Sequence, residues 1–335
     1  MRRRIDFGLI LGAAAAAVLL MSTGCGGGEA AEASGGKLTL VAYSTPREAY
    51  EAIIPAFEKS GPGRGVSFDQ SYGGSGEQSR AVEAGLPADV VAMSLTPDIE
   101  RLVDAGLVAD DWDRDEYDGM VTDSVVAFVV RKGNPEGIET WDDLTRDGIE
   151  VITPNPFTSG GARWNVMAAY GARLKLGDSE QQATEYLERL FANVAVQDKS
   201  AREALQTFAG GKGDVLLAYE NEAITAQAKD EDVDYIVPDE TILIENPVAV
   251  TTEAPEQAQA FVDFLRTPKA QRIFGEQGYR PIVKSVLSEF EYPEPSSLFT
   301  IDELGGWDTV ADKFFDREQG VMARIEQGLG VPTDD

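Results

Sequence analysis

The sequence predicts an α/β fold of two lobes, in which ligands bind where strands end and helices begin. Short apolar strands alternate with amphipathic helices from Lys37 onward. A long apolar segment at 124–135 ends at a turn, and a second series of strands and helices follows it. The chain has 335 residues, 43% of them hydrophobic, which is enough for two domains of ordinary size.

The first series is predicted from alternating apolar residues for strands and from i, i+3, i+4, i+7 spacing for helices. Ser75 and Gln78 have the spacing of a capping box, so we expect a helix to begin at Ser75. The predicted elements are a strand at 37–43, a helix around 50–57, a strand at 66–72, a helix from Ser75, a strand at 88–94 and a helix around 99–103.

The second series begins after the apolar segment at 124–135. The predicted elements are a strand at 149–152, a helix after Ser159, a helix at 179–192, a strand at 194–196, a helix from Ser200, a strand at 215–219, a strand at 245–252 and closing helices rich in phenylalanine. Most strands are expected to be parallel. We expect lobe 1 to comprise 37–125 and 249–335, and lobe 2 to comprise 126–248.

The composition excludes several classes of ligand and chemistry. The 58 acidic and 29 basic residues give a formal charge of -29 at pH 7, which argues against nucleic acid or an anionic membrane surface as the partner. The chain has no histidine, so it cannot form a Ser-His-Asp triad or a histidine-ligated zinc site. Its single cysteine rules out an intrachain disulfide. We therefore expect no metal, no cofactor and no enzymatic activity.

The N-terminal segment is typical of an exported protein. Arginines are followed by an apolar run from Phe7 to Met21 and by small residues as far as Cys25. This ending resembles the bacterial lipoprotein signal, in which the cysteine becomes the acylated N-terminus. We expect a signal peptide at 1–24, a flexible tether at 25–36, and a lipid at Cys25 that holds the protein on the outer face of the cell membrane or in the periplasm. A plain signal peptide or an uncleaved anchor is the alternative.

One type of junction occurs three times along the chain. A strand is followed by small residues at the start of a helix in "YGGSGEQ" with Ser75, in "TSGGARW" with Ser159, Gly160 and Gly161, and in "QDKSAREAL" with Ser200 and Ala201. Backbone N–H groups at a helix start attract anions, and glycine lets a ligand approach them closely. Ordinary capping would explain each junction separately. If the three helix starts converge, they form an anion-binding site.

These junctions belong to a set of segments that occur in a specific order from about Leu38 to the C-terminal region. The segments are "YGGSGEQ", "PADVV", "VVRKGNP", "WDDL", "VITPNPFTSGGARWN", "GDVLLAYENEA", "ENPVAV" and "FTIDELGGW". With them the chain resembles the bacterial sulfate-binding proteins of ATP-driven sulfate uptake. The resemblance implies a two-lobed, periplasmic-binding-protein-like fold of type II, with a hinge of two extended crossings. It also implies a monomeric receptor that binds sulfate between the lobes and delivers it to the permease subunits of an ABC transporter.

The resemblance also implies which residues hold the anion. In the family, sulfate is bound by backbone N–H groups, one serine hydroxyl and one aromatic donor, without a countercharge in direct contact. Carried onto this sequence, the hydroxyl belongs to Ser159, the aromatic donor is Tyr219, and the backbone donors are those of Ser44, Ser75, Gly160, Gly161 and Ala201.

Two arginines lie close to the assigned residues, and two of the assigned residues differ from the family. Arg163 and Arg202 each follow a proposed donor closely and are candidates for charges that steady the binding loops. A solvated ion pair at the surface is the alternative for both. Ser44 stands where the family often has aspartate, and Tyr219 stands where better-known members have tryptophan.

The donor set determines which anions can bind. Sulfate offers only acceptors, whereas monohydrogen phosphate has one proton that needs an acceptor. An indole N–H only donates, but the Tyr219 hydroxyl can also accept, so we expect looser selectivity against protonated anions. Thiosulfate, molybdate or another tetrahedral oxyanion remain alternatives to sulfate. A secreted ester hydrolase with Ser159 as nucleophile, and an adhesive lipoprotein with a vestigial pocket, are the alternatives from other classes.

Overall fold

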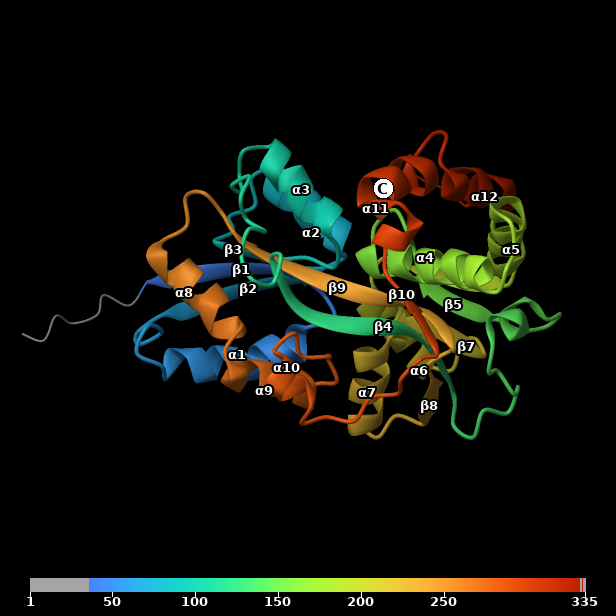
Figure 1. Cartoon of the computed structure of the whole chain (residues 1–335), viewed down its shortest axis with the longest axis horizontal. Helices are drawn as coiled ribbons and strands as arrows, with labels where there is room; N and C mark the ends of the chain where they lie inside the picture. Colours follow the sequence, from blue (N-terminus) through green and yellow to red (C-terminus); the bar gives the residue numbers. More distant parts are fainter. Residues whose placement is uncertain (1–35, 332, 334–335) are drawn as a thin grey trace, which may run out of the picture. The chain divides into compact units, whose positions relative to one another are not determined.

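The computed structural model describes residues 36–331 and 333, and its strands form one mixed sheet (Figure 1). The order is β2-β1-β3-β9-β4-β7-β5-β6, with β10 paired to β9 and β8 paired to β4. The strands are β1 (Lys37–Tyr43), β2 (Ser67–Gly73), β3 (Val90–Ala92), β4 (Met120–Arg131), β5 (Val151–Pro154), β6 (Val194–Asp198), β7 (Val215–Tyr219), β8 (Val233–Ile236), β9 (Glu240–Val250) and β10 (Ser297–Phe299).

Helices connect these strands and cover the sheet (Figure 1). The α-helices are α1 (Arg47–Glu58), α2 (Ser75–Glu83), α3 (Thr96–Asp104), α4 (Gly160–Lys175), α5 (Glu180–Ala192), α6 (Ala201–Ala209), α7 (Glu220–Ala228), α8 (Glu256–Leu265), α9 (Pro268–Glu276), α10 (Lys284–Leu287), α11 (Gly306–Val310) and α12 (Val321–Leu329). Two short 3-10 helices are η1 (Trp141–Thr145) and η2 (Asp302–Leu304), and a π-helical turn is η3 (Ala311–Phe315).

The expectation of mostly parallel strands needs correction at the two longest strands. β1 is parallel to β2 and β3, and β5 is parallel to β6 and β7. β4 and β9 are antiparallel to each other, and also to β7 and β3 respectively. Both begin earlier than predicted, at Met120 and Glu240. The first part of β4 pairs with the middle of β9, where Asp123 lies opposite Glu245, and the start of β9 pairs with β10.

One hydrophobic core packs helices against β1. It brings together Tyr50 and Phe57 of α1, Phe261 of α8 and Phe274 of α9. The ring centroids of Phe57 and Phe261 are 5.1 Å apart. This core fixes the end of β1, and with it the position of the segment that leads into α1.

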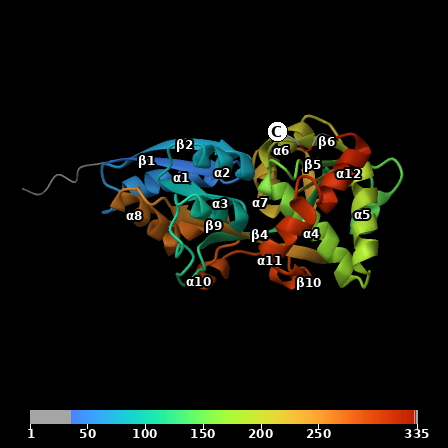
Figure 2. The ribbon, with the colours of Figure 1, turned by 90° about the horizontal axis from the view of Figure 1, so that it is seen from above.

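A second core surrounds α4 and includes the C-terminal helices. The ring of Trp164 in α4 meets that of Trp307 in α11 edge-on, with centroids 4.7 Å apart. Figure 2 shows α12 beside α5, in agreement with their contacts. Through these contacts, the C-terminal helices stabilise the first turns of α4. The predicted lobe boundaries within 37–335 remain a prediction.

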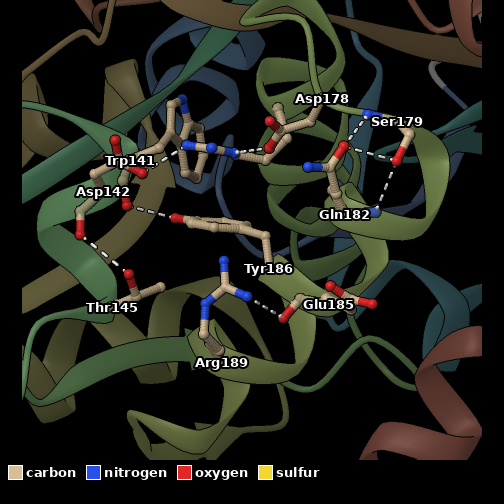
Figure 3. Close-up of polar contacts among 10 residues, drawn as sticks. Trp141, Asp142, Thr145, Asp178, Ser179, Gln182, Glu185, Tyr186 and Arg189 are labelled. Atoms are coloured by element: carbon tan, nitrogen blue, oxygen red, sulfur yellow. Dashed lines mark hydrogen bonds and ion pairs between the residues drawn. The ribbon is translucent and has the colours of Figure 1, made fainter.

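Polar contacts tie η1 to α5 (Figure 3). The Tyr186 hydroxyl donates to the Trp141 carbonyl oxygen. The helix predicted at 179–192 is α5, and Ser179 is its N-cap. The Ser179 hydroxyl accepts from the Gln182 N–H, and the Ser179 N–H donates to the Gln182 side-chain oxygen, which completes a capping box. These contacts hold α5 in place beside α4.

The described part of the chain has no helix that is long and apolar enough to span a bilayer. Cys25, the predicted signal peptide at 1–24 and nearly all of the predicted tether lie outside the described residues.

Candidate anion-binding site

The three strand-to-helix junctions meet in the structure. A Cβ placed on Gly74, the N-cap of α2, would lie 2.7 Å from the Thr158 carbonyl oxygen and 3.0 Å from the Lys199 carbonyl oxygen. Thr158 leads into α4 and Lys199 leads into α6. The Thr158 hydroxyl also donates to the Lys199 carbonyl oxygen at 2.8 Å. The starts of α2, α4 and α6 are therefore in contact. The three helix starts converge, which an anion-binding site built from all three requires.

Gly161 lies among the residues assigned to the anion. A Cβ placed on it would be 3.5 Å from each of three atoms, which are Ser159 Oγ, Ala201 Cβ and Tyr219 Cε1. These atoms come from the N-cap of α4, the first residue of α6 and the last residue of β7. A hydroxyl, a helix start and an aromatic ring thus surround the place where glycine carries no side chain.

Ser159 is the N-cap of α4, as predicted, but its hydroxyl does not cap the helix. Its backbone is extended, its side chain is 4% exposed, and no N–H of the first turn donates to it. In contrast, the Ser200 hydroxyl at the start of α6 accepts from the Glu203 N–H at 3.3 Å. The Ser159 hydroxyl and the first N–H groups of α4 are therefore left for an external acceptor, since helix starts leave these N–H groups without intrahelical partners.

Ser75 is the first residue of α2, whose N-cap is Gly74, so the predicted capping box with Gln78 is wrong. The Ser75 hydroxyl instead donates to Asp98 Oδ2 at 2.6 Å and accepts from the Ser94 N–H at 2.9 Å. A hydrogen bond to a carboxylate is stronger than one to a neutral group. Because the hydroxyl is occupied, the N–H is the group of Ser75 that can serve a ligand.

Ser44 lies at the end of β1, where the chain turns toward α1. It is buried, and the ring of the preceding residue, Tyr43, has its centroid 6.3 Å from that of Tyr219. The end of β1 is thereby placed beside the aromatic residue of the candidate site. The structure thus brings the neighbourhoods of all seven assigned residues together.

Arg163 steadies the loop that precedes α4. Its Nε donates to the Pro156 carbonyl oxygen at 3.0 Å, and its guanidinium lies 5.0 Å from the centroid of the Phe315 ring. Burial lowers the pKa of Arg163, and the charge of Asp98 opposes this change. The side chain thus holds the loop through Pro156.

Arg202 connects the start of α6 with α1. It donates from two nitrogens to the two carboxylate oxygens of Glu48, which also accepts from Lys229. The side chains of Arg202 and Glu48 are each 21% exposed, so this ion pair is largely shielded from water. Burial acts to raise the pKa of Glu48, but the hydrogen bonds from Arg202 and Lys229 outweigh it and lower the pKa to about 2. The pair holds the starts of α1 and α6 together.

The electrostatics of the site favour an anion through neutral groups. Burial raises the pKa of Tyr219 far above its usual value, so its hydroxyl keeps its proton. Glu222 is also buried. Burial raises the pKa of Glu222 to about 7, against the opposing charge of Arg202. Below that pH the Glu222 carboxyl is mainly neutral and does not repel an anion.

Sequence reasoning missed Ser94, which contacts this group of residues. Its Oγ is 2.6 Å from the Tyr219 hydroxyl oxygen. Ser94 lies two residues after β3 and at the end of the strand predicted at 88–94. Its position was a usable signal, because ligands of α/β folds gather at the carboxyl ends of strands. No group of three or more potential metal-ligating side chains occurs within the residues that the structure describes.

The family of the chain follows from its similarity to known proteins. The family model of the bacterial extracellular solute-binding proteins matches residues 38–280. The chain belongs to this family. A sulfate-binding protein of Synechocystis sp. is 42% identical over 96% of this chain and 95% of its own length. The solved structure of the sulfate-binding protein SubI from Mycobacterium tuberculosis H37Rv is 45% identical, with a TM-score of 0.81 over 84% of this chain and 99% of SubI.

A thiosulfate-binding protein of Pseudomonas aeruginosa is also similar, with 35% identity over 88% of this chain and 94% of its own length. The relatives are binding proteins rather than enzymes, and this member of the bacterial extracellular solute-binding proteins has a solute-binding role. The predicted resemblance and the predicted two-lobed, periplasmic-binding-protein-like α/β fold are confirmed.

Proposed function

We propose that this protein is an extracytoplasmic, lipid-anchored receptor that binds sulfate and delivers it to the permease of an ABC transporter. The position of Gly161 supports this proposal most strongly, because a Cβ placed on it would lie 3.5 Å from the Ser159 hydroxyl oxygen, from Ala201 at the start of α6 and from the Tyr219 ring. The similarity to sulfate-binding proteins at 42% and 45% identity supports sulfate as the ligand.

The proposed ligand shell consists of neutral donors. It comprises the hydroxyls of Ser159 and Tyr219 and the backbone N–H groups of Ser44, Ser75, Gly160, Gly161 and Ala201. A hydrogen bond to a charged group contributes about 1.5 to 3 kcal/mol. Several such bonds exceed the roughly 8.2 kcal/mol that a micromolar dissociation constant requires, with a margin for the free-energy cost of ordering.

The acidic surface does not prevent sulfate binding. The formal charge of -29 repels a dianion at long range. Salt screens such repulsion beyond about 8 Å at physiological ionic strength. The local dipoles of the helix starts at α2, α4 and α6 then dominate the interaction.

The ligand would act by joining two parts of the chain. Ser44 and Ser75 belong to the predicted lobe 1, and Ser159, Ala201 and Tyr219 belong to the predicted lobe 2. An anion that accepts hydrogen bonds from both lobes stabilises the closed arrangement over the open one. A permease that recognises the closed form would then receive only loaded protein.

Calorimetric titration of the purified protein with sulfate tests the proposal. We expect saturable one-to-one binding of sulfate. Thiosulfate should compete with sulfate for the site, because a thiosulfate-binding protein is also similar to this chain. Molybdate is the further competitor. Failure to bind sulfate, once carried-over ligand has been removed, would contradict the proposed function. Thiosulfate binding at least as tight as sulfate binding would assign the receptor to thiosulfate.

Ser159→Ala is expected to weaken sulfate binding by about 10- to 100-fold, since it removes one hydrogen bond to a charged ligand. The loss of fold stability should be small, because the hydroxyl does not cap α4. Calorimetry and thermal unfolding measure the two effects. Ser179→Ala is the matched control, because Ser179 caps α5; it should lower stability by about 0.5 to 2 kcal/mol and leave sulfate affinity unchanged. Unchanged affinity in Ser159→Ala would remove its hydroxyl from the site.

Cys25→Ala tests the proposed anchor. We expect the variant to leave the membrane fraction and to appear in the soluble extracytoplasmic fraction, because the acylated residue is lost. Fractionation followed by immunoblotting measures this distribution. A variant that stays membrane-bound to the same extent as the natural protein would contradict lipid attachment at Cys25.

A further inference from the structure

Ser94 contacts three of the residues assigned to the anion. Its Oγ is 2.6 Å from the Tyr219 hydroxyl oxygen, and either oxygen can be the donor. A Cβ placed on Gly160 would lie 2.7 Å from the same Oγ, so the hydroxyl packs against the first residue of α4. The Ser94 N–H donates to the Ser75 hydroxyl at 2.9 Å. Ser94 therefore adjoins the starts of α2 and α4 and the end of β7.

The backbone of Ser94 is held rigidly. Its carbonyl oxygen accepts from the Trp164 indole N–H at 2.8 Å and from the Asn246 side-chain amide at 3.1 Å. All three residues are buried, and Ser94 has 0% exposure. The Ser94 hydroxyl can therefore turn its proton, but the residue cannot move away from Tyr219.

Two paired hydroxyls can orient their protons in two ways. A hydroxyl both donates and accepts, whereas an indole N–H only donates. If Ser94 donates to Tyr219, the Tyr219 proton is free for an acceptor on the ligand. If Tyr219 donates to Ser94, the Tyr219 oxygen can accept a proton from the ligand.

We propose that Ser94 is a specificity-determining residue that lets the site accept singly protonated tetrahedral anions as well as fully ionised ones. With sulfate, the direction of donation is Ser94 to Tyr219 to ligand. With monohydrogen phosphate, the direction is ligand to Tyr219 to Ser94, so that the ligand proton is paired. The inference rests on the proposed function, since it requires an anion at the Tyr219 hydroxyl.

Ser94→Ala tests this role through the ratio of two affinities. The variant has no acceptor for the Tyr219 proton, so this proton must point toward the ligand and leave the phosphate proton unpaired. We expect the ratio of the phosphate to the sulfate dissociation constant to rise about tenfold or more, measured by calorimetry at about pH 8, where phosphate is mainly the monohydrogen dianion. The natural protein should bind both anions. A merely structural loss would weaken both anions equally.

A double-mutant cycle makes the test independent of small changes in packing. In a Tyr219→Phe background, Ser94→Ala should leave the affinity ratio unchanged, because the hydroxyl through which Ser94 acts is already gone. Thermal unfolding checks that each variant is folded. If Ser94→Ala is not folded, two other measurements decide. Failure of the natural protein to bind phosphate would overturn the inference, and a phosphate-to-sulfate ratio of dissociation constants that rises in Tyr219→Phe would support it.

The outcomes separate the inference from the proposed function. Sulfate binding with an unchanged phosphate-to-sulfate ratio in Ser94→Ala would overturn the role of Ser94 alone. Sulfate binding with no detectable phosphate binding by the natural protein would also overturn it. Absence of sulfate binding in the natural protein would instead contradict the proposed function, and the inference with it.

Discussion

Gly161→Ala is expected to lower sulfate affinity by about 100-fold or more while the protein stays folded. The added methyl group would occupy the space between Ser159 Oγ, Ala201 Cβ and Tyr219 Cε1. An anion excluded from that space loses two or more hydrogen bonds, each contributing about 1.5 to 3 kcal/mol. Calorimetric titration with sulfate measures the loss.

The fold should tolerate this substitution for two reasons. The three neighbouring atoms would be at 3.5 Å, which is ordinary van der Waals contact, and the residue lies in the first turn of α4. Alanine is also a better helix former than glycine by about 1 kcal/mol. Gly328→Ala is the matched control, because Gly328 is a helical glycine in α12 with open space around it. It should leave the affinity unchanged, and normal affinity in Gly161→Ala would show that sulfate binds elsewhere.

Glu48→Gln is expected to lower the free energy of unfolding at neutral pH by about 1 to 2 kcal/mol. The carboxylate accepts hydrogen bonds from Arg202 and Lys229, and its pKa falls from 4.5 to about 2 in the fold. A difference of one pKa unit corresponds to about 1.4 kcal/mol, and the partial exposure of the pair reduces the effect. Urea unfolding of both proteins at neutral pH measures it.

The pH dependence gives this prediction a sign. Because the folded pKa lies below the unfolded one, the stabilisation by Glu48 is complete above about pH 4.5 and is lost as the pH falls toward 2. The difference between the natural protein and Glu48→Gln should therefore shrink across this window. Asp69→Asn is the control, because Asp69 pairs with Lys37 where both side chains are about 60% exposed, and it should change little. An equal effect of the two substitutions at neutral pH would contradict the role given to Glu48.

The secondary structure was largely predictable because it depends on local sequence. The strands at 37–43 and 215–219 have the predicted bounds, since both are apolar runs whose neighbours do not alter the pattern. The starts of β4 and β9 were not predictable, because polar residues such as Asp123 and Glu240 are strand residues only through their pairing with Glu245 and Ser297, respectively. That pairing joins segments far apart in the sequence.

The candidate site shows the same division between local and distant effects. Ser75, Ser179 and Ser200 have similar capping patterns in the sequence, yet only Ser179 and Ser200 accept a hydrogen bond from their helix. Ser75 differs because Gly74 takes the cap position and Asp98 binds its hydroxyl. These partners are brought together by the tertiary fold, so spacing alone could not reveal them.

The two long strands β4 and β9 also determine how cooperatively the protein unfolds. β4 pairs with β9 near Val125 and continues to pair with β7 from Val126, while β9 pairs with β3 at its far end. β4 and β9 therefore form backbone hydrogen bonds with strands on both sides of the sheet. If the strands of one half unfolded alone, the other half would be left with an unpaired sheet edge. Loss of one core is thus coupled to loss of the other, and partly unfolded forms with one intact half are disfavoured. If the protein acts outside the cytoplasm as proposed, this coupling would protect it from proteolysis.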